Sequence, residues 1–321
     1  MPYGKRTFGW VCAVAVAAAL TATATGCAAQ PSGKEPRSGA AGAATARPAP
    51  VRPLTWQQQL RISDAEERLT KQCMNRHGFS YWETRILTLE ESRPVRYVQD
   101  DVEWARRYGY GSGIDMKADR ARRHNPNAAY RGSLSAARRA AYDTALDGGD
   151  QARLLTAQLP GGRGEVRKRL GGCTAEAESK LYGDPVAWFH AAKIATNLRP
   201  LYVPELMRDK RLRTAVAAWS RCMRQHGYSY DDPQAAHDAV RQRTALSERS
   251  ATAGEALKAE RETAVADARC ARETSLKSVG TACEKLYVGR LRKQYGSTVD
   301  TYWLLMRTAF KHAEELVQPR A

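Results

Sequence analysis

Residues 73–81 read Cys-Met-Asn-Arg-His-Gly-Phe-Ser-Tyr, and residues 222–230 read Cys-Met-Arg-Gln-His-Gly-Tyr-Ser-Tyr, so six of the nine positions are identical. Each copy of this repeated motif ends a stretch with helical apolar spacing and has a glycine just past the last apolar position. Helices commonly end at a glycine in the left-handed conformation. The repeated motif therefore predicts two equivalent helix C-termini, one in each of two related halves of the chain.

The apolar side chains before each copy recur every three or four residues, as on the buried face of a helix. In the first half they are Ile62, Ala65, Leu69 and Cys73, and in the second half they are Leu212, Val216, Trp219 and Met223. This spacing predicts one helix over about 56–76 and a second that begins at Asp209, a good N-cap residue.

Capping residues and glycines indicate further helices along the chain. They are expected over about 135–148, 164–182, 184–197, 233–240 and 252–275, followed by a helical face over 276–291 and a last amphipathic helix over 299–317. Residues 97–130 read mostly as loop, and no alternating run is long enough to predict a sheet. Many Ala, Arg and Glu residues and few aromatic ones favour helix. The predicted fold class is all-α.

The N-terminus has the layout of an export signal. Lys5 and Arg6 precede an apolar run over 8–20, and small residues follow. Such a run is too short to remain as a membrane-spanning anchor. Residues 24–27, Ala-Thr-Gly-Cys, resemble a bacterial lipobox, although Ala stands where Leu is usual. The resemblance implies that Cys27 becomes the mature N-terminus and carries lipid, including palmitate, whereas ordinary cleavage nearby would release an unanchored protein.

The sequence divides into four segments. Residues 1–26 are the predicted signal peptide, and 27–54 are a lipid-anchored linker rich in Ala, Gly, Pro and Ser. This composition buries too little apolar surface to fold, and a coil of this length reaches about 30 Å. Residues 55–198 and 199–321 are the predicted first and second helical halves, with Pro200 near their boundary.

Five cysteines remain after the signal and the lipid-bearing cysteine are set aside, and an exported protein lies in an oxidising environment. When the two halves are aligned on the repeated motif, Cys222 is equivalent to Cys73. The next cysteine in each half is Cys270 and Cys173, and these two are followed by similar residues, in Cys-Ala-Arg-Glu and Cys-Thr-Ala-Glu. We therefore expect the disulfides Cys73–Cys173 and Cys222–Cys270, with Cys283 left as a buried free thiol.

A zinc site is the alternative for the same residues. Cys73 and His77 share a helix face, as do Cys222 and His226, so the two copies together would supply two thiolates and two imidazoles to one ion. That site would leave the other cysteines unpaired in an oxidising environment. A cationic side chain at a helix C-terminus is also favoured by the helix dipole alone. The prediction is therefore no metal and no cofactor, with zinc kept as the alternative.

The chain carries a formal net charge of +17. Its basic residues cluster at Arg106-Arg107, Arg120 to Arg123, Arg138-Arg139 and Arg208 to Arg213. Inside a cell this charge would favour nucleic acid as a partner, but export argues against that. Outside the membrane the anionic partners are lipid headgroups and phosphate-bearing wall polymers. The alternative is that these clusters are solvated helix faces without a partner.

No catalytic motif is recognisable. The chain has no zinc-protease HExxH sequence, no nucleophile elbow and no glycine-rich phosphate loop or dinucleotide fingerprint. The acidic pairs Asp100-Asp101 and Asp231-Asp232 would suit carboxylate chemistry, but the second, directly before Pro233, is placed to cap a helix. A hydrolytic or wall-active enzyme with its site in 97–130 is the alternative function.

The lipobox and the repeated motif, taken with Asn125-Pro126-Asn127 and Ala266-Asp267-Ala268-Arg269-Cys270, resemble exported lipoproteins of unknown function that are common in high-GC actinobacteria. The resemblance covers most of residues 20–285. It implies a lipid-anchored protein with disulfides at the extracellular face of the cell membrane, and it implies no activity. The sequence therefore predicts a non-catalytic binding or scaffold protein of the envelope.

Overall fold

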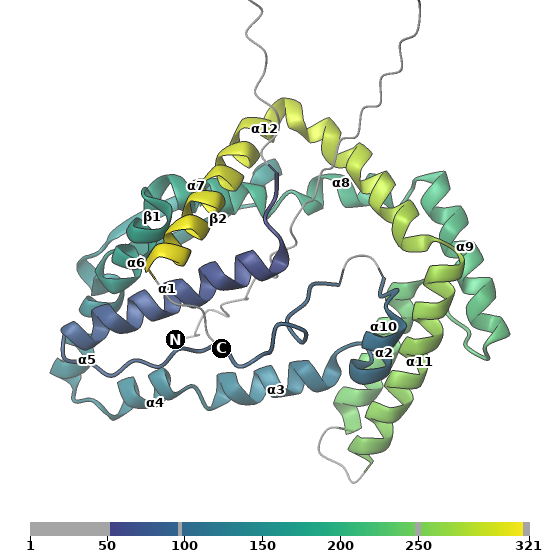
Figure 1. Cartoon of the computed structure of the whole chain (residues 1–321), viewed down its shortest axis with the longest axis horizontal. Helices are drawn as coiled ribbons and strands as arrows, with labels where there is room; N and C mark the ends of the chain where they lie inside the picture. The colour runs from purple at the N-terminus through teal and green to yellow at the C-terminus, as the bar shows by residue number, and fades with distance from the viewer. Residues whose placement is uncertain (1–51, 96–97, 248–251, 317–321) are drawn as a thin grey trace, which may run out of the picture.

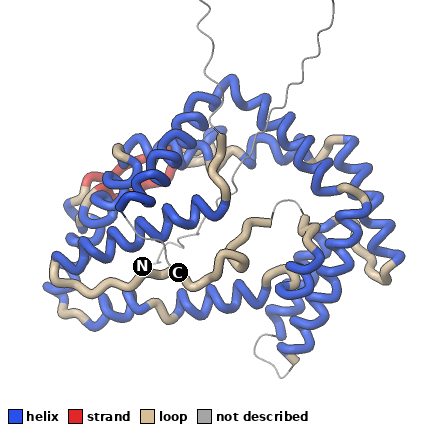
Figure 2. The backbone as a smooth tube through the Cα atoms, viewed as in Figure 1, coloured by secondary structure: helices blue, strands red, loops and turns tan. Residues whose placement is uncertain are grey.

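The computed structural model describes residues 52–95, 98–247 and 252–316, and the described chain is predominantly helical (Figures 1 and 2). The all-α prediction is confirmed. The predicted signal peptide, Cys27 and the linker up to residue 51 lie outside the described residues.

The elements follow one another with short connections. The helices are α1 (Trp56–Arg76), α2 (Val102–Tyr108), α3 (Ser112–Arg123), α4 (Pro126–Ser133), α5 (Ala136–Asp147), α6 (Gly172–Tyr182), α7 (Pro185–Ala195), α8 (Arg199–Leu206), α9 (Lys210–Gln225), α10 (Pro233–Ser247), α11 (Ala253–Glu273) and α12 (Leu276–Leu316). Two short 3-10 turns, η1 (Gly149–Gln151) and η2 (Pro160–Gly162), flank the first strand of a hairpin formed by β1 (Arg153–Gln158) and β2 (Glu165–Leu170).

Side-chain caps begin several of the helices, and three of these caps, Ser135, Asp184 and Asp209, are predicted from the sequence. At the start of α1 the Gln58 backbone N–H donates to Thr55 Oγ1 at 3.3 Å, and the Thr55 N–H donates to Gln58 Oε1 at 2.8 Å. This reciprocal pair satisfies two backbone groups that the helix leaves open. Ser135, Asp184 and Asp209 cap α5, α7 and α9 without the reciprocal bond, because only the side chain of the cap residue accepts from a backbone N–H of the first turn.

Two hydrophobic clusters lie on either side of the molecule, and α12 takes part in both. The first contains Ile62 and Leu69 of α1, residues of α6 and α7, and Trp303 and Met306 near the end of α12. The second joins α8, α9 and α11 to the start of α12. Figure 1 shows α12 running along one side from α9 and α11 to α1 and α6, while α3 and α4 run along the opposite side.

The prediction of two separate segments over 276–291 and 299–317 is wrong, because α12 is one helix of 41 residues. Gly296 lies inside it and is buried. A glycine weakens a helix interior by only about 1 kcal/mol, and packing against both clusters outweighs that cost. At about 1.5 Å per residue the helix is about 60 Å long, enough to connect the two clusters.

The prediction that the chain forms no sheet is also wrong. The chain forms an antiparallel hairpin over 153–170, and its register pairs Arg153 with Leu170 and Gln158 with Glu165. Leu155 and Ala157 pack against Phe189 of α7. The helix predicted over 164–182 is therefore wrong before α6 begins at Gly172. Val166 and Leu170 are four residues apart, a spacing that fits both the helical period and the alternation of a strand.

Residues 97–130 are not mostly loop as predicted, because α2, α3 and the start of α4 lie within them. The spacing of apolar residues does not indicate α3, because this helix buries few side chains. Ser112 is its one fully buried residue. The signal for α4 was present. The Asn125 carboxamide oxygen accepts from the backbone N–H groups of Asn127 and Ala128, and Pro126 occupies the first turn, where proline is favoured.

Candidate functional site

The two copies of the repeated motif end their helices with the same backbone hydrogen bonds. The Phe79 N–H donates to the Met74 carbonyl at 3.0 Å, and the equivalent Tyr228 N–H donates to the Met223 carbonyl at 2.9 Å. With φ values of +75° at Gly78 and +84° at Gly227, both are Schellman ends. The prediction of equivalent helix C-termini is confirmed.

Both predicted disulfides form. Cys73 of α1 is bonded to Cys173 of α6, and Cys222 of α9 is bonded to Cys270 of α11. Cys283 is free and buried, as expected. Burial raises the pKa of its thiol, which favours the unreactive protonated form.

The four residues of the zinc alternative do not come together. Each histidine lies beside the disulfide of its own half, so the ligand atoms of Cys73, His77 and Cys173 are within 4.8 Å of one another, and the same holds for their equivalents in the second half. The four cysteine sulfurs are held in disulfides. Each histidine does lie close to the cysteine on its own helix, as the sequence predicts. The further prediction, that the cysteine and histidine of one half meet those of the other half at one ion, is wrong.

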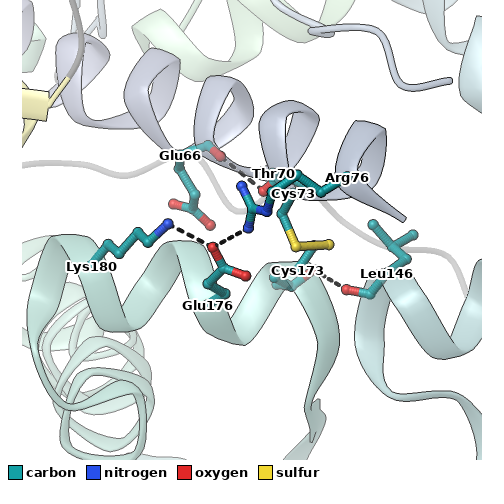
Figure 3. Close-up of a disulfide and its surroundings, with 9 residues drawn as sticks. Glu66, Thr70, Cys73, Arg76, Leu146, Cys173, Glu176 and Lys180 are labelled. Atoms are coloured by element: carbon teal, nitrogen blue, oxygen red, sulfur yellow. Dashed lines mark hydrogen bonds and ion pairs between the residues drawn. A yellow bond between two sulfur atoms is a disulfide. The ribbon is translucent and has the colours of Figure 1, made fainter. Parts of the chain in front are cut away.

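An ion-pair cluster surrounds the first disulfide (Figure 3). Glu176 lies between Arg76, whose Nη2 is 2.5 Å from its carboxylate, and Lys180, whose Nζ is 2.6 Å from it. Hydrogen bonds from Lys180 and Arg76 lower the pKa of Glu176. On the same side, burial and the nearby Glu178 carboxylate raise the pKa of Glu66 to about 7. This half therefore holds the Glu176 carboxylate as a stable anion and shifts the Glu66 carboxyl toward its neutral form.

Three of the four carboxylates in the acidic pairs of the sequence, those of Asp100, Asp101 and Asp232, serve structural roles. Asp101 caps α2 by accepting from the Trp104 N–H at 3.1 Å, and it also accepts from Arg93 at 3.0 Å. Asp100 forms an ion pair with Lys277. Asp232 accepts from the Ala235 N–H at 2.8 Å at the start of α10, as expected of a cap. These carboxylates are occupied by partners from the fold.

Two buried carboxylates of α11 hold the turn between α2 and α3. Glu260, which is 1% exposed, accepts from the backbone N–H groups of Tyr110 at 2.9 Å and Ser112 at 3.0 Å. Asp267 accepts from the Tyr110 hydroxyl at 3.0 Å and from Trp219 Nε1 at 2.8 Å. Burial raises the pKa of Asp267 to about 7, against these two hydrogen bonds. Sequence analysis missed this network because its members are far apart in the chain.

A groove of about 550 Å³ lies beside this network, between α3, the loop after α1 and the start of α11. Its apolar lining comprises Ile86, Met116, Ala121 and Leu257, and its basic lining comprises Lys117, Arg120 and His124. The described residues that line it include no carboxylate. The predicted basic cluster over 120–123 therefore lies at an apolar hollow, which the sequence alone did not show.

The basic residues around this groove differ in their pairing. Lys117 is bound to Glu91 at 2.7 Å, and Arg122 is paired with Asp119. Arg120 and Arg123 are exposed and form no ion pair within the described part of the chain. Two uncompensated positive charges therefore stand at the end of α3, next to apolar surface.

Among the helices of the described residues, none has an apolar stretch long enough to cross a bilayer. Comparison of the chain with protein-family models, with curated proteins and with solved structures found no match.

Proposed function

We propose that the chain is a lipoprotein at the extracellular face of the cell membrane, anchored through Cys27, and that it is a non-catalytic binding or scaffold protein. Its proposed ligands are the anionic phosphate groups of wall polymers or lipid headgroups. The proposal rests on the sequence features of export and lipidation together with the basic, partly apolar groove beside α3.

The groove is the observation that carries the binding proposal. Arg120 and Arg123 are exposed cations without an acidic partner among the described residues, and the groove that Arg120 lines holds Ile86 and Leu257 as well. Guanidinium groups match the geometry of phosphate oxygens. Apolar surface at the same place suits a ligand that combines an anionic group with a hydrocarbon or sugar-ring face.

The alternative function is a hydrolase with its site in 97–130. General acid–base hydrolysis needs carboxyl or imidazole groups that reach a substrate. In this region Asp101 caps a helix, and Glu260 and Asp267 from α11 are buried with their hydrogen bonds made inside the protein. We therefore prefer binding over catalysis for this groove.

The test measures binding of the Cys27→Ser chain, which cannot be lipidated, to three surfaces: anionic vesicles, zwitterionic vesicles and a polyglycerol-phosphate polymer. We expect binding to an anionic surface that weakens as salt is added, because salt screens charge attraction. Preference for the polymer over vesicles assigns the ligand to the wall, and the reverse assigns it to headgroups.

Variants of the groove sharpen this test. Arg120→Ala with Arg123→Ala should weaken binding by about 30-fold, since each basic residue near an anionic surface contributes about 1 kcal/mol. The matched control is Arg153→Ala with Arg163→Ala, which removes the same charge from exposed positions at the hairpin that form no ion pair with residues 52–95, 98–247 or 252–316. Equal losses of affinity in the two double variants would show that binding depends only on the net charge of the protein. That result would contradict binding at the groove. No binding to any anionic surface at low salt would contradict the proposal itself.

A further inference from the structure

Each half of the protein places an exposed imidazole directly beside a buried disulfide. His77 lies with Cys73 and Cys173, and His226 lies with the second disulfide, with all ligand atoms of each trio within 4.8 Å of one another. The two trios use different partner elements. The first is completed by α6, which follows the hairpin, and the second by α11, which follows α10. The same constellation is thus built twice in different surroundings.

The fold does not require a histidine at this position. The helix ends are closed by backbone hydrogen bonds and by glycine, and His77 and His226 contribute only their backbone N–H groups. Neither imidazole ring makes a hydrogen bond or ion pair with the described part of the chain, and both residues are exposed. The helix dipole favours any cationic side chain at this position, so stability alone does not select histidine.

We propose that each half contains a metal site, formed by two thiolates and one imidazole, that assembles when its disulfide is reduced. A dithiol reductant reduces each disulfide to two thiols and is itself oxidised to a disulfide. Binding of Zn²⁺ then releases two protons as the thiols become thiolates. The inference is independent of the proposed binding groove.

The geometry suits a tetrahedral ion. The paired Cα atoms are 5.4 Å apart in the first half and 5.6 Å apart in the second. In a tetrahedral site with Zn–S bonds of about 2.3 Å the two sulfurs lie about 3.8 Å apart. Side-chain rotation supplies this separation, and the helix pairs that carry the cysteines hold them in place. Thiolate and imidazole are also the ligand types that Zn²⁺ prefers.

A fourth ligand distinguishes the two sites. Glu273 follows Cys270 by one helical turn, and its Oε2 lies 3.5 Å from Cys222 Sγ. The equivalent Glu176 in the first half is already held by Arg76 and Lys180, as Figure 3 shows. The second site therefore gains a carboxylate ligand and the first takes water. Zinc should bind the second site more tightly.

The test uses the exported chain carrying Cys12→Ser, Cys27→Ser and Cys283→Ser, so that reduction exposes only the four site cysteines whether or not the signal segment has been removed. The chain is reduced under anaerobic conditions, freed of reductant and titrated with Co²⁺ and then Zn²⁺. We expect two Co²⁺ ions per reduced chain, with thiolate-to-cobalt absorption and tetrahedral ligand-field bands, and none per oxidised chain. Zn²⁺ should displace both.

Variants separate the two sites. His77→Ala and His226→Ala should each weaken one site by more than about tenfold, since even removing a group that only supports a ligand costs 10–100-fold. Glu273→Gln should bring the affinity of the second site toward that of the first. His190→Ala is the control, because His190 lies in α7 and belongs to neither trio.

Three outcomes would overturn the proposal. One is a reduced chain that stays helical by circular dichroism and binds no cobalt. Another is cobalt that binds without thiolate absorption or with no response to the His77 and His226 variants. The last is a reduced chain that loses its helical signal and does not recover it when Zn²⁺ is added, because metal binding to a native site should restore the fold.

Discussion

Glu260 Oε1 lies 2.9 Å from the backbone nitrogen of Tyr110, although the two residues are 150 positions apart in the chain. The same oxygen accepts from the Ser112 N–H, and Oε2 accepts from the Thr244 hydroxyl at 3.0 Å. A side chain from α11 thereby satisfies the open backbone groups of a turn that belongs to the first half of the sequence. This contact attaches α2 and α3 to the second half and so places the groove.

Glu260→Ala should lower the free energy of unfolding by about 2–4 kcal/mol, because it leaves two buried backbone N–H groups and a hydroxyl without an acceptor. Urea denaturation followed by circular dichroism measures the change. Glu262→Ala, at an exposed position on the same helix, should change the stability by less than about 0.5 kcal/mol. Similar values for the two variants would show that the Glu260 contacts contribute little.

Gly109→Ala should destabilise the protein more than Gly78→Ala. Both glycines have positive φ, +64° at Gly109 and +75° at Gly78, but Gly109 also has ψ −128°, which lies outside the left-handed helical region that an alanine adopts at a cost of about 1 kcal/mol. At Gly109 an added Cβ would also lie 2.8 Å from Glu260 Cγ, whereas at Gly78 it would meet no atom within 4 Å. The difference between the two melting temperatures measures the backbone strain and the steric contact at Gly109 together. Equal shifts would contradict a tight approach of the turn to α11.

Asp267 should make the stability fall as pH rises from about 4 to about 7. Its pKa is raised from 3.8 to about 7 in the folded protein, so in this window the folded state keeps a proton that the unfolded state releases, and rising pH favours unfolding. The contribution is about 2–4 kcal/mol. Denaturation midpoints across this window should vary less in Asp267→Asn, which keeps an acceptor for Trp219 but does not titrate. An unchanged pH profile would assign the dependence to other groups.

Replacing either disulfide by two alanines should lower the free energy of unfolding by about 4–5 kcal/mol. The enclosed segments span 100 and 48 residues, and the chain-entropy cost grows only slowly with length, so the two losses should differ by less than about 1 kcal/mol. Cys283→Ala is the control for loss of a buried sulfur. A loss confined to one disulfide would show that the halves are not equivalent in stability.

Cys27→Ser should move the exported protein from the membrane fraction to the medium. The lipobox-like sequence predicts thioether-linked lipid at this cysteine, and the protein should incorporate labelled palmitate only when Cys27 is present. Immunoblots of membrane and medium fractions, with mass analysis of the N-terminal peptide, measure both effects. Retention of the Cys27→Ser chain in the membrane fraction would contradict lipid anchoring.

Much of the fold could be predicted from local sequence. The N-caps Thr55, Ser135 and Asp209 and the terminal glycines Gly78 and Gly227 act on backbone groups within a few residues of themselves. Their effect is therefore readable in a short window. The internal repeat also allowed contacts between distant residues to be predicted, because the equivalent cysteines of the two halves indicated which pairs would form disulfides.

Prediction failed where local signals were weak or fitted two structures. Val166 and Leu170 suit a helix and a strand equally, and contact with Phe189 of α7 decides for the strand. Helix α3 has too little apolar periodicity to be recognised. Its position depends on the preceding turn, which is held by Glu260.

The sequence by itself determined the helical class, the equivalent helix ends and the disulfide partners. Capping and apolar spacing act over a few residues, and the internal repeat can be recognised from identical residues in the two halves. Tertiary structure decided that α12 spans both clusters, that each histidine joins its own disulfide, and that Arg120 lies at an apolar groove. These relationships depend on which apolar surfaces, far apart in the chain, are buried against one another. No short stretch of sequence contains that information.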